Sequence, residues 1–206
     1  MPTLLHLDSS PLATSISREL TAEFAKTWGL AHPEGTVIYR DLAAHAPQPV
    51  DTAWIYSAYT PEAARSAEQN AALATSDELI AELEQAEEYV IGVAMHNFSI
   101  PAVLKLWVDQ VARKDKTFAY GAAGPQGLMV GKKATIVVAS GGVYDAGTPM
   151  GAYNFADPYL KAVLGFLGVT DIKVIAAGGA AKLMTGAVDR ESFLKPSLEL
   201  VRSEAA

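Results

Sequence analysis

Five short apolar runs recur along the chain and predict the strands of a sheet. Each is rich in Val, Ile, Leu or Thr, and polar residues, Gly or Pro lie between them, as is typical of buried strands. The runs cover residues 3–7, 36–39, 89–94, 134–139 and 172–177. None reaches the ~20 residues of a membrane-spanning helix.

Between these runs, apolar residues repeat at three- and four-residue spacing and predict amphipathic helices. In the first helix Leu20, Phe24 and Trp28 share one face. The helices are expected over residues 17–28, 62–84, 101–111, 154–167 and 189–201. Gly168 is expected just past the end of the fourth helix, and Pro196 weakens the middle of the fifth.

Residues 41–61 fit neither pattern. Proline punctuates the segment and three aromatic residues lie within it: Pro47, Pro49, Pro61, Trp54, Tyr56 and Tyr59. We therefore predict a long loop, of the kind that serves function or lies at an interface. A Gly- and Pro-rich segment occupies residues 121–127, and residues 144–152 are expected to form another loop.

Strands that alternate with helices predict an α/β fold, a doubly wound parallel sheet of five strands in a three-layer αβα arrangement. We expect residues 1–206 to form a single domain. A dinucleotide-binding sheet would carry G-x-G-x-x-G directly after the first strand. Residues 9–17 contain serines there and no glycine, which favours the flavodoxin-like order 2-1-3-4-5.

Composition narrows the class further. The 206 residues are 50% hydrophobic and carry a formal charge of −7. Lys and Arg are scattered singly, so no nucleic-acid footprint is present. The chain has no cysteine, which excludes disulfides, thiolate nucleophiles and Fe–S clusters. The N-terminus lacks the features of a signal peptide. We expect a soluble, cytoplasmic protein without membrane or nucleic-acid partners.

A hydroxyl-rich turn, residues 9–17, joins the first strand to the first helix. The free N–H groups and positive dipole end of a helix N-terminus attract anions, and Ser10, Ser15 and Ser17 add side-chain donors. Such neutral donors suit a phosphate monoester. The alternative is that Ser15 or Ser17 only caps the helix, as serine often does.

Two further segments follow the third and fourth strands. Met95, His96, Asn97 and Phe98 combine an amide that reads the edge of a ring with apolar walls. Ala139, Ser140, Gly141 and Gly142 let backbone approach a ligand closely. Alternatively, Met95 and Phe98 are core residues, His96 is a loop histidine and residues 139–142 form an ordinary turn. In the order 2-1-3-4-5 all three segments meet at the switch point, where ligands bind.

The sequence does not contain the residue patterns of a metal site or of a nucleophile elbow. The four histidines are dispersed, without the spacing of a metal site, and Gly-x-Ser-x-Gly is absent. Redox chemistry would therefore have to come from an organic cofactor.

Over nearly its whole length the chain resembles the FMN-dependent NADH-azoreductases, a family of flavodoxin-like NAD(P)H quinone and azo reductases. The turn Ser9-Ser10 with Ser15-Ile16-Ser17 and the segment 95–98 carry the resemblance. It extends to residues 117–120 (Thr-Phe-Ala-Tyr), 124–128 (Gly-Pro-Gln-Gly-Leu), 131–133 (Gly-Lys-Lys) and 164–171 (Leu-Gly-Phe-Leu-Gly-Val-Thr-Asp).

The resemblance implies a noncovalently bound FMN. Its phosphate would be held by Ser10, Ser15, Ile16 and Ser17. Its ring would be bordered by Met95, His96, Asn97, Phe98, Ala139, Ser140, Gly141 and Gly142. No side chain would be catalytic, because the flavin does the chemistry. The resemblance further implies a homodimer with its active site at the interface. NADH or NADPH would donate hydride to the flavin, and quinones or azo compounds would accept two electrons in a ping-pong reaction.

Three positions depart from the family pattern. His96 replaces a tyrosine, Ser140 stands where the family has arginine, and Gly178 where it has glutamate. Because histidine titrates near neutral pH, we expect His96 to modulate the reaction: reduction of the flavin should speed up below about pH 6.5. We expect these three departures to affect which substrate and which nicotinamide the protein uses. They should affect the fold and FMN binding less.

Two other classes of function are open at the level of sequence. One is a flavodoxin-type electron carrier without enzymatic activity, which would normally be shorter and more acidic. The other is a cofactor-free binding module on the same fold. The aromatic-rich segment 41–61 favours an enzyme with a dimer interface and a substrate lid.

Overall fold

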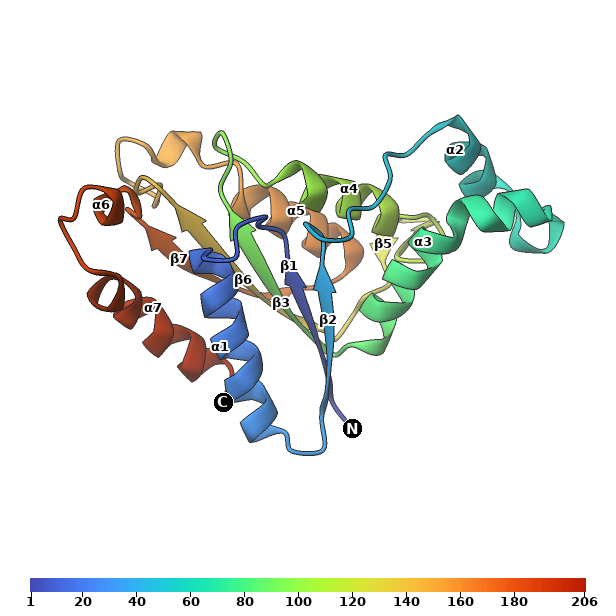
Figure 1. Cartoon of the computed structure of the whole chain (residues 1–206). Helices are drawn as coiled ribbons and strands as arrows, with labels where there is room; N and C mark the ends of the chain where they lie inside the picture. Colours follow the sequence, from blue (N-terminus) through green and yellow to red (C-terminus); the bar gives the residue numbers. More distant parts are fainter.

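The computed structural model describes residues 1–206 and contains one central five-stranded sheet, whose strands run parallel in the order β2-β1-β3-β6-β7 (Figure 1). The strands are β1 (Thr3–Asp8), β2 (Thr36–Asp41), β3 (Glu88–Ala94), β6 (Lys133–Ser140) and β7 (Asp171–Gly178). In order of appearance among these five, this is 2-1-3-4-5, so the predicted topology is confirmed. Each predicted strand is present and is one or two residues longer than its apolar run.

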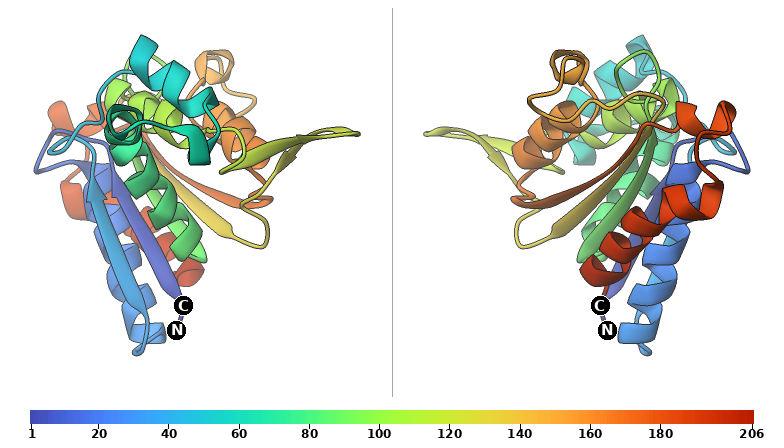
Figure 2. Two further views of the ribbon diagram at one scale, coloured as in Figure 1. Left: turned by 90° about the vertical axis from the view of Figure 1, so that its right-hand side faces the viewer. Right: turned by 90° about the vertical axis from the view of Figure 1, so that its left-hand side faces the viewer.

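Helices cover both faces of the sheet, which confirms the three-layer arrangement (Figures 1 and 2). One face carries α1 (Ile16–Ala31) and α7 (Arg190–Glu204). The other carries α3 (Ala67–Gln85), α4 (Ala102–Val111) and α5 (Asp157–Leu167). No helix is both long and apolar enough to cross a membrane.

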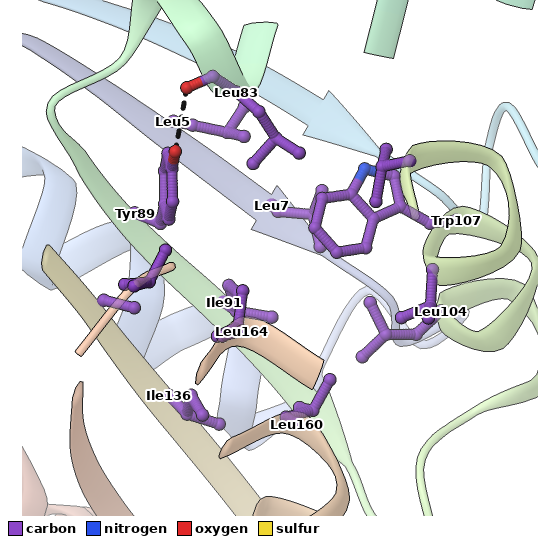
Figure 3. Close-up of a cluster of buried hydrophobic side chains, with 14 of the residues drawn as sticks. Leu5, Leu7, Leu83, Tyr89, Ile91, Leu104, Trp107, Ile136, Leu160 and Leu164 are labelled. Atoms are coloured by element: carbon purple, nitrogen blue, oxygen red, sulfur yellow. Dashed lines mark hydrogen bonds between the residues drawn. The ribbon is translucent and has the colours of Figure 1, made fainter. Parts of the chain in front are cut away.

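One hydrophobic core lies on each side of the sheet, between the strands and the helices that cover that face. Two cores form because successive side chains of a strand point to opposite faces. Leu5 and Leu7 of β1 join the larger core under α3, α4 and α5 (Figure 3). Leu4 joins the smaller core under α1 and α7. All three are buried, which is why β1 carries leucines on both faces and shows no strict alternation of apolar and polar residues. Tyr89 stays in the larger core by donating its hydroxyl to the Leu83 carbonyl at 2.8 Å.

The prediction of a structureless loop over residues 41–61 was wrong, because α2 (Thr52–Tyr59) lies within it. Asp51 begins this helix, and its carboxylate accepts a hydrogen bond from the Trp54 N–H at 2.8 Å. The aromatic residues obscured the helical period. The single helix predicted over 62–84 is also divided: a 3₁₀ turn (Glu62–Ala64) ends before Ser66, which starts α3 with a capping box.

The Gly- and Pro-rich segment after α4 forms a hairpin, β4 (Phe118–Gly121) and β5 (Gly124–Gly127), that projects from the body in both views of Figure 2. Its base packs on α5, where the rings of Phe118 and Phe166 lie 4.8 Å apart. The α5 helix ends at Leu167, and Gly168 directly after it has a φ of 105°, which confirms the predicted stop. Two short helices were not predicted: the 3₁₀ turn Gly151–Tyr153 and α6 (Ala181–Met184).

Candidate functional site

The three segments that the sequence singles out lie together at the carboxyl end of the sheet. Their strands are neighbours, with Asp8 of β1 opposite Gly92 of β3, and Ala94 of β3 opposite Ala139 of β6. Beyond the last pair, the Met95 N–H still donates to the Ala139 carbonyl at 2.8 Å. The expected meeting of segments 9–17, 95–98 and 139–142 is therefore present in the structure.

The first turn of α1 presents unused hydrogen-bond donors to this end of the sheet. The N–H groups of Ile16, Ser17 and Arg18 have no partner within the protein. Ser15 stands at the N-cap, but its side chain caps nothing; its hydroxyl oxygen lies 3.0 Å from that of Ser17, and both residues are buried. The alternative that Ser15 serves only as a helix cap is therefore wrong.

The two serines that precede this turn have different roles. The Ser9 hydroxyl is buried and donates to the Gly92 carbonyl at 2.7 Å, so it joins β1 to β3. The Ser10 side chain is also buried, and its oxygen only accepts a long hydrogen bond of 3.4 Å from the Leu12 N–H. The hydroxyl proton of Ser10 remains free to be donated to a ligand.

A hollow of about 190 Å³ lies beside the ends of β3 and β6. Met95, Asn97, Phe98, Gly141 and Tyr144 line it. The amide of Asn97, the thioether of Met95 and two aromatic rings thus face one small volume. These groups suit a flat ring with polar edges.

The turn that shapes this hollow is strained. Asn97 and Phe98 both adopt left-handed backbone conformations, with φ of 46° and 74°. Asparagine tolerates this region, but phenylalanine rarely adopts it. The paired backbone hydrogen bonds of His96 and Ser99, at 2.9 and 3.0 Å, hold the turn, and the Phe155 N–H holds the Phe98 carbonyl at 2.8 Å. Strain maintained by surrounding contacts is common at ligand sites.

In the segment 95–98, the side chains of His96 and Met95 have different surroundings from those of Asn97 and Phe98. The His96 side chain is exposed and does not line the hollow, while its backbone closes the turn. Met95 is half-buried and also packs against the larger core. The alternative that Met95 is a core residue is thus partly correct, since its side chain contacts both the core and the hollow.

In the segment 139–142, backbone approaches the site closely. Ser140 is buried, and its hydroxyl donates to the Gly142 carbonyl at 2.9 Å. A Cβ on Gly142 would meet the ring of Tyr144 at 3.1 Å, so glycine lets this ring pack on the loop. Of the four residues, only Gly141 lines the hollow.

Sequence reasoning did not single out an aromatic wall that surrounds Phe98. The Phe98 ring centroid lies 5.3 Å from that of Tyr153 and 6.1 Å from that of Tyr144. Tyr153 and Phe155 are 49% and 57% exposed, so their rings are open to a ligand. The only signal in the sequence is the number of aromatic residues near the loop 144–152. No group of three or more His, Asp or Glu side chains is placed to hold a metal ion.

Comparison with known proteins agrees with this geometry. A family model described as the flavodoxin-like fold matches residues 2–196. An FMN-dependent NADH:quinone oxidoreductase of Acidobacterium capsulatum is 62% identical over 206 residues, and the match covers all of both chains. A second protein of that name, from Burkholderia lata, is 45% identical over 97% of each chain.

A solved structure agrees as well. The azoreductase of Bacillus anthracis superposes with a TM-score of 0.89 at 27% identity, over 100% of this chain and 99% of its own. The chain therefore belongs to this flavodoxin-like family, together with the FMN-dependent NADH:quinone oxidoreductases that match its whole length.

Proposed function

We propose that the protein is an FMN-dependent NADH:quinone oxidoreductase that also reduces azo compounds. One observation carries the proposal. At one end of the sheet, hydrogen-bond donors that could bind a phosphate lie next to a hollow that suits a flat ring with polar edges. The names of the relatives favour an enzyme over an electron carrier.

The residues of the site fit FMN. The buried hydroxyls of Ser10, Ser15 and Ser17 and the free N–H groups of residues 16–18 are neutral donors, which suit a phosphate that is bound and not cleaved. Asn97 can both donate to and accept from the edge of the ring, and Phe98 and Tyr144 offer flat apolar surfaces. When bound, FMN supplies the two-electron redox chemistry for which no side chain of this protein is suited. The protein contributes binding, orientation and exclusion of water.

The proposed substrates are flat aromatic molecules. The exposed ring of Tyr153 beside Phe98 provides a surface on which a quinone or an azo dye can stack. NADH or NADPH is the proposed electron donor, and donor and acceptor react in ping-pong order. His96, Ala139, Ser140 and Gly142 are also proposed to border the flavin ring. The hollow itself is lined by residues close to them in the sequence.

A spectrum and an assay test the function. The purified protein should be yellow, with flavin absorbance bands, and acid should release FMN and not FAD. With NADH it should reduce a quinone, whereas an electron carrier would show the spectrum without this turnover. Intact protein that takes up no flavin even after incubation with FMN would refute the proposal.

We also propose a homodimer with the active site at its interface. The α2 helix stands at the same end of the molecule as the site loops (Figure 1). Trp54 anchors it by donating its indole N–H to the Gln110 side chain at 2.8 Å. Ile55, Tyr56 and Tyr59 remain 45%, 70% and 73% exposed. Aromatic residues are enriched where proteins meet, so this helix face is the proposed contact.

Replacing both Tyr56 and Tyr59 with aspartate should therefore weaken the dimer and lower activity. Loss of an interface hot spot raises a dissociation constant by about thirtyfold or more. Leu30→Asp is the control, because Leu30 is 74% exposed at the far end of α1. Light scattering measures the assembly. A fully active wild-type monomer would contradict the interface.

A further inference from the structure

The loop that carries the phosphate donors cannot hold its own shape. Residues 9–15 contain no glycine, and the only backbone hydrogen bond that closes within them joins the Ser15 N–H to the Leu12 carbonyl at 3.1 Å. A phosphate site needs N–H groups facing the anion and carbonyl oxygens turned away from it. Contacts from outside the loop must therefore fix its orientation.

Arg18, in the first turn of α1, holds the start of the loop. Its Nε donates to the Ser10 carbonyl at 2.7 Å. The same guanidinium donates to the Asp41 carboxylate at 2.6 Å and to the Tyr39 hydroxyl at 2.9 Å. Arg18 thus joins the loop to the edge strand β2, and only 17% of its side chain is exposed.

Arg190, the first residue of α7, holds the other end of the loop. It donates to the Thr14 carbonyl at 3.0 Å. It also donates to the Glu19 carboxylate of α1, at 2.5 and 3.0 Å. A residue 176 positions away in the sequence therefore contacts the residue directly before the donor turn.

Both arginines are already neutralised by carboxylates. The Asp41 carboxylate and the nearby Asp8, 3.6 Å away, face Arg18; the hydrogen bond to Asp41 is the main cause that raises the pKa of Arg18, and it lowers the pKa of Asp41. Glu19 faces Arg190. Their effect on a phosphate should therefore come from the orientation of the loop more than from added positive charge.

We propose that Arg18 and Arg190 are positioning residues that hold the Ser10 and Thr14 carbonyls away from the phosphate. This leaves the N–H groups of residues 16–18 and the hydroxyls of Ser10, Ser15 and Ser17 facing it. The inference rests on the proposed FMN function and deepens it. Neither arginine was among the residues selected from the sequence.

Binding of FMN and of riboflavin to the flavin-free protein tests the inference, because riboflavin has the same ring but no phosphate. Quenching of flavin fluorescence gives both dissociation constants. The variants are Arg190→Gln and Arg18→Lys, which keeps the charge but loses the planar fork. Arg202→Gln is the matched control, since Arg202 of α7 also pairs with a glutamate of α1, Glu23, but does not contact the loop.

Each variant should bind FMN about tenfold more weakly, riboflavin should be unaffected within about twofold, and Arg202→Gln should match the wild type. Thermal unfolding of the flavin-free proteins shows whether Arg18→Lys folds; if it does not, Arg190→Gln decides the question. Unchanged FMN affinity, an equal loss for riboflavin, or full affinity in Arg18→Lys would overturn the inference. Wild-type protein that binds no flavin would instead refute the proposed function itself.

Discussion

Replacing Asn97 with glycine is expected to weaken FMN binding by roughly ten- to hundredfold. Loss of a hydrogen-bond partner from a group that becomes buried costs about 1–3 kcal/mol, and the Asn97 amide offers the hollow both a donor and an acceptor. Glycine accepts the φ of 46° at this position without strain. The substitution therefore removes the amide without forcing the turn to change. Fluorescence titration with FMN measures the loss.

Asp115→Gly is the control for Asn97. Asp115 is also a non-glycine residue in the left-handed region, with a φ of 62°, but it lies in the turn after α4 and does not line the hollow. Its replacement should leave FMN affinity unchanged. If Asn97→Gly binds FMN as tightly as the wild type, Asn97 is only a turn residue and the hollow does not read the ring through this amide.

The second large effect is expected at Gly127, at the base of the projecting hairpin. A Cβ at this position would lie 2.2 Å from the backbone nitrogen of Gly168 and 2.3 Å from the carbonyl carbon of Leu167. These are backbone atoms of the end of α5, so no side-chain rotation can relieve the clash. Gly127→Ala should cost about 3 kcal/mol, the upper end of overpacking costs, and lower Tm by about 6–12 °C.

Gly121→Ala, in the same hairpin, is the matched control. The nearest atom to its Cβ would be the Gly124 carbonyl oxygen at 3.8 Å, an ordinary contact. Its melting temperature should therefore stay close to that of the wild type. Equal melting temperatures for Gly127→Ala and the wild type would show that the hairpin moves freely against α5, against the close packing described above.

Much of the fold follows from local patterns. The apolar runs predict all five strands of the central sheet. The signal is clearest in β3 and β6, which are buried along almost their whole length, because a strand buried on both faces is almost continuously apolar. The serines and the missing glycines after β1 select the flavodoxin-like order over the dinucleotide order. In the helices the three- and four-residue period is clear wherever one face is buried, as for Leu160 and Leu164 in α5. The stop at Gly168 follows from local backbone chemistry.

The misassigned segments share a physical cause, because their conformation depends on contacts rather than on a local period. The α2 helix is apolar on several sides, and the bond from Trp54 to Gln110 together with the burial of Ser57 shows which side faces inward. The hairpin 118–127 is rich in glycine and reads as irregular chain, yet antiparallel pairing and the packing of Phe118 on Phe166 order it.

The candidate site divides in the same way. The sequence by itself determined which segments carry donors, amide and aromatic groups, since these residues follow three predicted strands. Only the tertiary structure decided how those groups are oriented. It brings Tyr153 beside Phe98, turns the His96 ring toward solvent, and joins Arg190 to the Thr14 carbonyl. These features depend on residues that come together, or stay apart, only in the folded chain. A local sequence pattern therefore could not predict them.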